Sequence, residues 1–369
     1  MKSIVILGGS FSGVSTAHRI LKQTAKTGPV KIILVSPNTH FYWNIAAPRA
    51  LVPGQVADDK IFQPIAPGFS QYPASQFEFI VASAKNVDFV AKKVVISGSA
   101  GNKTLDYDFL ILATGSSTRA DTPFKTLGST EATRDALHDF QARVKKSKTI
   151  VVAGAGATGV ETAGELSFEY GQQKEIILIT SGPTILEGAI ASVSKTAIDL
   201  LQSLKVDIKL QTKIIGSAQT PDGRQELTLS DGDKLITDMY IPTFGVRPNS
   251  SYAPTKYLNT DGFVMVDDYL KVKGVEDVWA IGDVSDLEPP QFMFANKQSA
   301  HLAKNIILIL SNKKPLPYKS GTRGMGVQIG RKAGTGYLGS IKLPGFLVSM
   351  LRKNLFIDNM GPTVTGSAF

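Results

Sequence analysis

The sequence contains no cysteine among its 369 residues. A thiolate nucleophile, a redox-active disulfide, an iron–sulfur cluster and a cysteine zinc site are therefore excluded. Histidine is also scarce: the four histidines, His18, His40, His138 and His301, are scattered, and no two have the spacing of metal ligands. We therefore expect no metal site.

Long apolar runs are absent as well. Runs such as Ile306–Leu310 are far shorter than the roughly 20 residues that a membrane-spanning helix needs. The N-terminal residues enter an apolar strand pattern at once, without a visible signal or transit peptide, and Lys2 stands where N-myristoylation needs glycine. We expect a cytoplasmic protein that is soluble or peripheral to a membrane.

The composition is that of a folded globular protein, with 43% hydrophobic and 19% charged residues and a net charge of +9. The basic residues are spread along the chain, and the densest group, Lys145–Lys148, lies at an expected helix end. This balance suits anionic dinucleotides or an anionic membrane surface. Because the basic residues are spread out, nucleic acid is not an expected partner.

The strongest motif is the stretch Thr149–Leu166, TIVVAGAGATGVETAGEL. An apolar run, Ile150–Ala153, ends in Gly154, Gly156 and Gly159 at G-x-G-x-x-G spacing, and a helix-compatible segment follows. In such a loop the first glycine makes the turn and the second lets the backbone approach a pyrophosphate. The third lets the helix and strand pack closely. The motif predicts a dinucleotide-binding strand–loop–helix unit.

A second loop of this kind follows the apolar run Lys2–Leu7 near the N-terminus. Gly8 and Gly13 hold the outer glycine positions, and Ser10 replaces the middle glycine. The residues after the loop repeat at helical spacing, and Lys31–Val35 has the pattern of a second strand. Because serine is small, this loop also predicts a site for dinucleotide phosphates.

Neither loop is followed by the acidic residue that normally binds the ribose of a dinucleotide at the end of the next strand. The two strands end instead in Ser36-Pro37 and Thr180-Ser181. A serine hydroxyl can bond a ribose hydroxyl, but less strongly than a carboxylate does. No arginine that would mark a 2′-phosphate adjoins Ser181, so the nucleotide at the second loop is either NADH or NADPH.

Further patterns complete an α/β fold. Strands are expected at Phe77–Val81, Lys93–Ile96, Asp108–Ala113, Glu175–Thr180, Val206–Leu210, Glu226–Leu229, Lys234–Ile241, Phe263–Val266, Val278–Asp283 and Gly326–Ile329, and helices at Ser129–Lys146, Ile198–Leu204 and Asn296–Leu310. Pro221-Asp222-Gly223 predicts a hairpin turn. We predict two nested Rossmann-like dinucleotide-binding domains: residues 1–121 and 238–315 form one, residues 122–237 form the other, and residues 316–369 form a small C-terminal segment.

Three other stretches lie where α/β sheets bind ligands. Ala113-Thr114-Gly115 ends one buried strand in a glycine turn, and Gly282-Asp283 ends another. Asp283 is either a ligand-binding carboxylate or the N-cap of a helix. The aromatic stretch His40–Asn44, followed by Arg49, either walls a flat ring or belongs to the core of a connecting helix.

These motifs together resemble the two-dinucleotide-fold flavoproteins of the pyridine nucleotide-disulfide oxidoreductase superfamily, which includes glutathione-reductase-like enzymes. The resemblance covers nearly the whole chain. It also rests on Thr243–Pro248 (TFGVRP) and Ala280–Asp283 (AIGD). Within the superfamily, Asn44–Ala50 and Arg352–Phe356 look like the apoptosis-inducing-factor-like branch, and especially the ferroptosis-suppressor type of NAD(P)H:quinone oxidoreductase with its fungal relatives.

The resemblance implies FAD as the bound cofactor and NAD(P)H as the electron donor. The residues implied for FAD are Gly8, Gly9, Ser10, Phe11, Ser12, Gly13, Ser36, Asn44, Arg49, Ala113, Thr114, Gly115, Gly282 and Asp283, and those implied for the donor are Gly154, Gly156 and Gly159. Two residues match catalytic or cofactor-facing positions: Glu161, beside the nicotinamide, and Lys125, near the FAD. Glu161 has an alternative interpretation as a first-turn acid favoured by the helix dipole.

The implied activity is transfer of a hydride from NAD(P)H to FAD, and of electrons from FAD to a quinone or dioxygen. Reduction of a disulfide is excluded because the chain has no cysteine. The alternatives are a reductase of a small electron-transfer protein, a biosynthetic tailoring flavoenzyme, and an apoptosis-inducing-factor-like flavoprotein that signals or binds nucleic acid.

The tail Leu343–Phe356 is apolar and flanked by Lys342. It either lies against a membrane where quinones reside, such as the mitochondrial or lipid-droplet surface, or forms a homodimer contact or core packing.

Overall fold

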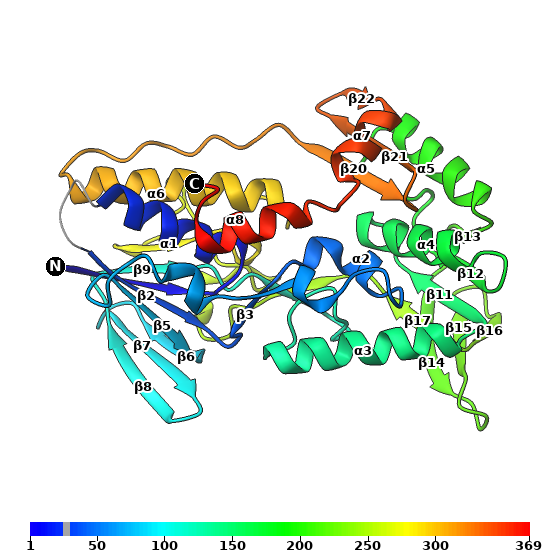
Figure 1. The fold of residues 1–369 in the computed structure, drawn as a ribbon, viewed down its shortest axis with the longest axis horizontal. Helices are drawn as coiled ribbons and strands as arrows, with labels where there is room; N and C mark the ends of the chain where they lie inside the picture. Colours follow the sequence, from blue (N-terminus) through cyan, green and yellow to red (C-terminus); the bar gives the residue numbers. More distant parts are fainter. Residues whose placement is uncertain (25–29) are drawn as a thin grey trace.

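The computed structural model describes residues 1–24 and 30–369, and its first unit is a parallel sheet with the strand order β19-β9-β1-β2-β5. These strands are β1 (Lys2–Leu7), β2 (Val30–Ser36), β5 (Phe77–Val81), β9 (Phe109–Leu112) and β19 (Val278–Ala280). Helices α1 (Phe11–Thr24) and α6 (Phe292–Leu310) lie side by side in Figure 1, above this sheet.

Alternation along β1 explains the layers around this sheet. Ile4 and Ile6 pack into the cluster that contains the α1 residues Val14 and Ala17. Val5, which points the other way, packs into a second cluster with residues of a small antiparallel sheet. That sheet consists of β6 (Ser83–Asp88), β7 (Lys93–Gly98) and β8 (Gly101–Asp106).

The second unit repeats this plan around β11 (Thr149–Ala153) and α4 (Ala157–Tyr170). Its parallel sheet has the order β13-β12-β11-β17, and it is completed by β12 (Glu175–Ile179), α5 (Ala191–Ser203), β13 (Asp207–Lys209) and β17 (Met239–Pro242). An antiparallel sheet of β14 (Ile214–Gln219), β15 (Gln225–Leu229) and β16 (Lys234–Thr237) shares a core cluster with β11 and β12. The predicted turn at residues 221–223 joins β14 to β15, so this prediction is confirmed.

Two strand predictions are wrong. The stretch predicted as one strand, Lys234–Ile241, is two strands in different sheets, because Asp238 turns the chain between them. Its carboxylate accepts hydrogen bonds from the backbone N–H groups of Lys148 and Thr149. The predicted strand Phe263–Val266 is not a strand, because its residues make only isolated bridges to several different segments instead of a continuous ladder.

Several shorter elements and helix α3 (Thr130–Lys146) lie outside the two parallel sheets. β10 (Ser116–Thr118) pairs with β18 (Val246–Pro248), and α3 begins at Ser129, whose side chain accepts a hydrogen bond from the Ala132 N–H. The remaining short elements are β3 (His40–Tyr42), β4 (Phe62–Pro64), α2 (Ala47–Ala50) and the 3₁₀ helices Asn44–Ala46, Asp58–Lys60, Ala66–Phe69, Thr255–Tyr257, Gly282–Val284 and Ile357–Asn359. The three domain boundaries stay a prediction.

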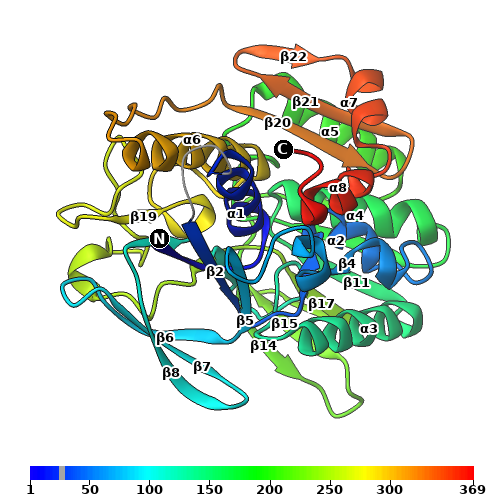
Figure 2. The ribbon, with the colours of Figure 1, turned by 60° about the vertical axis from the view of Figure 1, so that its left-hand side comes forward.

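The C-terminal segment spans both units. β20 (Gly324–Ile329), β21 (Ala333–Leu338) and β22 (Ile341–Leu343) form a sheet that contacts α4 and α5, and α7 (Gly345–Arg352) covers that sheet, as Figure 2 shows. The chain then returns to the first unit, where α8 (Met360–Thr365) contacts α1. No helix within the described ranges is long and apolar enough to span a bilayer.

Candidate functional site

The first glycine loop is built for close packing of β1 against α1. Gly8 has a φ of +121°, which other residues rarely adopt, and any side chain there would overlap the Ala113 carbonyl. A Cβ on Gly13 would overlap the Gly8 carbonyl oxygen. These two glycines therefore let the chain turn directly from strand to helix, and they leave the N-terminus of α1 facing the middle of the loop.

Two adjoining cavities, of about 210 and 150 Å³, open beside this loop. Both are lined by Ser10, Ala113 and Thr114, so they meet at the loop and at the end of β9. The sequence-predicted residues that line one or both are Gly8, Gly9, Ser10, Phe11, Ser12, Ser36, Asn44, Ala113, Thr114, Gly115, Lys125 and Asp283. The fold thus brings together most of the predicted first-loop site.

Asp283 lies in the smaller cavity and forms an ion pair. Its Oδ2 is 2.6 Å from Lys125 Nζ and accepts a hydrogen bond of 3.0 Å from Ser116 Oγ. The 3₁₀ helix at Gly282–Val284 has no side-chain cap, so the N-cap interpretation of Asp283 is wrong. Gly282 does not line either cavity; a Cβ there would overlap Ser12 Oγ, so its role is close packing.

The aromatic stretch His40–Asn44 contains residues of both predicted kinds, some in the core and some at the wall of a cavity. Phe41 and Trp43 are fully buried in the core, whereas Tyr42 lines both cavities and Asn44 lines the smaller one. The Asn44 amide donates to the Phe124 carbonyl, which fixes the segment that carries Lys125. The predicted helix is only the short α2.

Sequence reasoning missed several residues of the larger cavity, among them Asn38, Asn249 and Tyr252. The Asn38 N–H donates to Ser36 Oγ, so this hydroxyl already has one partner. The side-chain oxygen of Asn38 is buried, and within the described residues it has no hydrogen-bond partner. An unpaired buried oxygen at the wall of a cavity fits a site whose polar groups complete their bonds with a ligand. The one feature of the sequence that could have indicated Asn38 as a site residue is its position two residues after the end of β2.

The second glycine loop has the same geometry as the first. Gly154 has a φ of +99°, and a Cβ on Gly159 would overlap the Gly154 carbonyl oxygen. Gly156, at the N-cap of α4, differs: nothing in the described chain lies within 4 Å of a Cβ built there. The open space at Gly156 is where the N-terminus of α4 is accessible to an anionic group.

Glu161 is buried one turn into α4, where it is the fifth residue of the helix. The first-turn interpretation is therefore wrong. Its Oε1 is 2.6 Å from Arg352 Nη2 and accepts a hydrogen bond of 3.3 Å from the Gln328 N–H. Burial raises the pKa of Glu161 above its usual range, and Arg352 and the Gln328 N–H oppose this shift.

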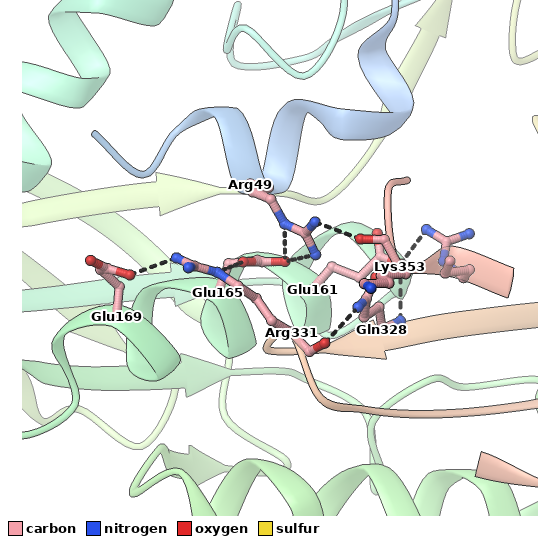
Figure 3. Close-up of polar contacts among 8 residues, drawn as sticks. Arg49, Glu161, Glu165, Glu169, Gln328, Arg331 and Lys353 are labelled. Atoms are coloured by element: carbon pink, nitrogen blue, oxygen red, sulfur yellow. Dashed lines mark hydrogen bonds and ion pairs between the residues drawn. The ribbon is translucent and has the colours of Figure 1, made fainter. Parts of the chain in front are cut away.

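Glu161 is the first of three carboxylates on one face of α4, at spacings of four residues. The Glu165 carboxylate lies 2.7 Å from Arg49, and that of Glu169 lies 2.6 Å from Arg331. Figure 3 shows these arginines converging on α4 from α2 and from the β20–β21 turn.

Arg49 lies in this network and not in the lining of the two cavities, although the sequence analysis assigned it to the FAD. Its Nε donates to Glu165 Oε1 and its Nη1 donates to the Lys353 carbonyl. The four-residue spacing of the glutamates was visible in the sequence, but their partners were not.

Two parallel sheets, each with a glycine loop between a strand and a helix, define a two-dinucleotide-fold α/β protein. A family model described as pyridine nucleotide-disulphide oxidoreductase matches residues 2–303. The chain belongs to this family, which confirms the predicted family and fold class.

Three similar proteins illustrate this membership. Oxidoreductase ptaL of Pestalotiopsis fici is 56% identical over 370 residues, with full coverage of both chains. Ferroptosis suppressor protein 1 of Xenopus tropicalis is 28% identical, with 98% of this chain and 96% of that protein covered. The structure of the sulfide:quinone oxidoreductase of Aquifex aeolicus superposes with a TM-score of 0.80 at 19% identity, covering 99% of this chain and 92% of that one.

Proposed function

We propose that the protein is an FAD-dependent NAD(P)H oxidoreductase that uses a quinone-like acceptor or dioxygen. The observation that carries this proposal is the pair of adjoining cavities that run from the first glycine loop to Asp283. FAD, when bound, supplies the redox-active ring that links the donor to the acceptor.

The residues around the cavities fit such a cofactor. The loop from Gly8 to Ser12 offers backbone N–H groups and a helix N-terminus for the pyrophosphate. Ser36 and Asn38 line the larger cavity and would hold the adenosine side, while Lys125 and Asp283 in the smaller cavity would hold the flavin side. We assign Arg49 no direct contact with the cofactor, because its guanidinium is held by Glu165.

The second loop would bind the donor. Gly156 leaves space for the pyrophosphate at the N-terminus of α4, and Glu161 would lie beside the nicotinamide. A carboxylate at that place stabilises the positive charge that develops on the nicotinamide as it loses a hydride. Ser181, just after β12, is exposed, and neither of its chain neighbours is acidic, although the Glu187 carboxylate lies 3.0 Å from a Cβ built on Gly182. Because no acid stands at the end of the strand itself, we propose that both NADH and NADPH are accepted.

A quinone acceptor is favoured by one surface feature. Phe346, Met350 and Leu351 on α7 are exposed by 75%, 63% and 54%, and Ile341 on β22 is exposed by 70%. Exposed apolar side chains gathered on one short helix and its neighbouring strand fit a contact with a lipid surface, where quinones dissolve. One of the similar structures is, by its name, a quinone oxidoreductase. A homodimer through the same face is the competing proposal.

An absorption spectrum tests the proposed function directly. We expect the purified protein to show oxidised flavin bands that bleach without air on addition of NADH or NADPH. A short-chain quinone should then restore the bands faster than dioxygen does. A colourless protein that cannot be reconstituted with FAD would overturn the proposal, as would a yellow protein that neither nucleotide bleaches.

A further inference from the structure

The cation that faces Glu161 comes from the C-terminal segment. Arg352 is the last residue of α7, a helix in which Val348 is the buried residue and the outer face is apolar and exposed. From this position its guanidinium reaches the carboxylate of Glu161 on α4. A helix that faces solvent on one side therefore carries the counter-charge of a buried carboxylate on the other.

The hairpin beneath α7 is shaped for this contact. A Cβ on Gly326 would lie 3.5 Å from the Arg352 side chain, and a Cβ on Gly334 would lie 3.1 Å from Val348. The distance at Gly334 is tight, so a side chain there would crowd Val348 and push α7 away from the sheet, whereas the distance at Gly326 is an ordinary van der Waals contact. Gly334 in β21 thus lets α7 lie low enough for Arg352 to reach Glu161.

Two other cations near Glu161 pair with other carboxylates of α4, and one of them, Arg49, also lowers the pKa of Glu161. Arg49 from α2 pairs with Glu165, and Arg331 from the β20–β21 turn pairs with Glu169 at 2.6 Å and lies 4.0 Å from Glu165. Within the described residues, Arg352 is the cation in ion-pair contact with Glu161, while Glu165 on the same helix repels a second negative charge.

We propose that Arg352 is a positioning residue that keeps Glu161 ionised and oriented toward the donor, so that α7 controls the charge beside the nicotinamide. This inference rests on the proposed function. It adds a residue from the C-terminal segment to the donor site of the second unit.

The buried ion pair between Glu161 and Arg352 is explained better by a role in the reaction than by a contribution to the stability of the fold. Burying an ion pair costs desolvation energy that its attraction need not repay, and apolar replacements are often neutral or stabilising. Gln328 beside the pair is buried, and its side-chain oxygen lacks a partner among the described residues. The incomplete hydrogen bonding indicates that this cluster is not arranged for maximal stability.

Removal of the Arg352 charge should raise the pKa of Glu161, because burial would then act with less opposition. The protonated form of Glu161 would then persist to higher pH than in wild type, and this form does not stabilise a positive nicotinamide. High pH should restore the carboxylate and with it the rate.

The test compares holoprotein variants in anaerobic stopped-flow bleaching of the flavin, from about pH 6 to pH 10, because burial raises the pKa of Glu161. Relative to wild type, we expect Arg352→Gln to bleach about tenfold or more slowly at neutral pH and to recover as the pH rises, whereas Arg352→Lys keeps most of the wild-type profile. In a Glu161→Gln background, Arg352→Gln should have no further effect. The control is Arg323→Gln, which removes one exposed charge from the same segment.

A second readout does not depend on turnover. Difference infrared spectra across the pH range should show the protonated carboxyl of Glu161 persisting to higher pH in Arg352→Gln than in wild type, and this band should be absent from the double variant with Glu161→Gln. A profile for Arg352→Gln parallel to that of wild type, or an equal loss in Arg352→Lys, would overturn the inference. Wild-type protein that does not bleach would instead refute the proposed function.

Discussion

Gly156→Ala should separate donor binding from folding. Gly156 has a φ of −71°, which alanine adopts freely. No atom of the described residues lies within 4 Å of a Cβ built on Gly156. Alanine is a poorer N-cap than glycine, by no more than about 1 kcal/mol. We therefore expect a melting temperature within a few degrees of wild type and full retention of FAD.

The effect on the donor should be much larger. A methyl group at Gly156 occupies the space through which a pyrophosphate approaches the N-terminus of α4. Loss of one hydrogen bond from a backbone N–H to a charged phosphate costs about 1.5–3 kcal/mol, which corresponds to roughly a tenfold to hundredfold higher Kd. Gly156→Ser is a useful second variant, because Ser10 occupies the corresponding position of the first loop and its hydroxyl can replace the lost donor.

The assay is the donor concentration dependence of anaerobic flavin bleaching, which yields Kd and the limiting rate separately. We expect Kd to rise while the limiting rate stays near the wild-type value. Gly159→Ala is the contrasting variant: its Cβ would overlap the Gly154 carbonyl, so it should destabilise the second unit itself. A Gly156→Ala protein that is folded and binds both nucleotides with unchanged Kd would refute our assignment of the second loop.

Other predictions concern separate parts of the molecule. Asp283→Ala should release FAD during gel filtration, because Lys125 loses its partner and the cofactor loses a hydrogen-bond acceptor; an unchanged ratio of flavin to protein absorbance would contradict this. Ser181→Asp should raise the ratio of kcat/KM for NADH over NADPH about tenfold or more, since a carboxylate binds the ribose 2′-hydroxyl and repels a 2′-phosphate; equal ratios in both proteins would place the ribose elsewhere. Wild-type protein should sediment with anionic lipid vesicles, and Phe346→Ser should weaken this sedimentation. If Phe346→Ser instead converts a dimer to a monomer, the homodimer contact is favoured. Burial lowers the pKa of His18 to about 4 from 6.5, so the stability that its neutral form contributes is present above about pH 6.5 and lost as the pH falls toward 4; thermal melting in His18→Gln should depend less on pH in this window.

The two glycine loops were predictable because their signals are local. Each depends on glycines a few residues apart, between an apolar run and a helical pattern, and the structure forms both turns as expected. The error at Lys234–Ile241 has the opposite cause. All of its residues suit a strand, and the break at Asp238 depends on backbone groups of Lys148 and Thr149, about 90 residues away.

The partners of the buried carboxylates could not be predicted from local sequence patterns either, because these partners are also far away in the sequence. The four-residue spacing from Glu161 to Glu165 predicts that they share a helix face, but it does not predict what covers that face. Arg352 and Arg49 come from opposite ends of the chain, and only the docking of the C-terminal hairpin and of α2 brings them to α4.

Helix α4 thus links three parts of the proposed reaction. Its N-terminus faces the open space at Gly156, its second turn carries Glu161, and its next two turns hold Arg49 from the first unit and Arg331 from the C-terminal segment. The Arg49–Glu165 pair is buried, whereas the Arg331–Glu169 pair is about a third exposed. A shift of α4 against the first unit would therefore move the proposed donor site and break a buried ion pair at the same time, and an unpaired buried charge is costly. Together with the Arg352–Glu161 pair, the Arg49–Glu165 pair therefore couples the position of the proposed donor site to α7 and to the first unit. This coupling is a reason for charged residues to occupy an interface that apolar residues could fill.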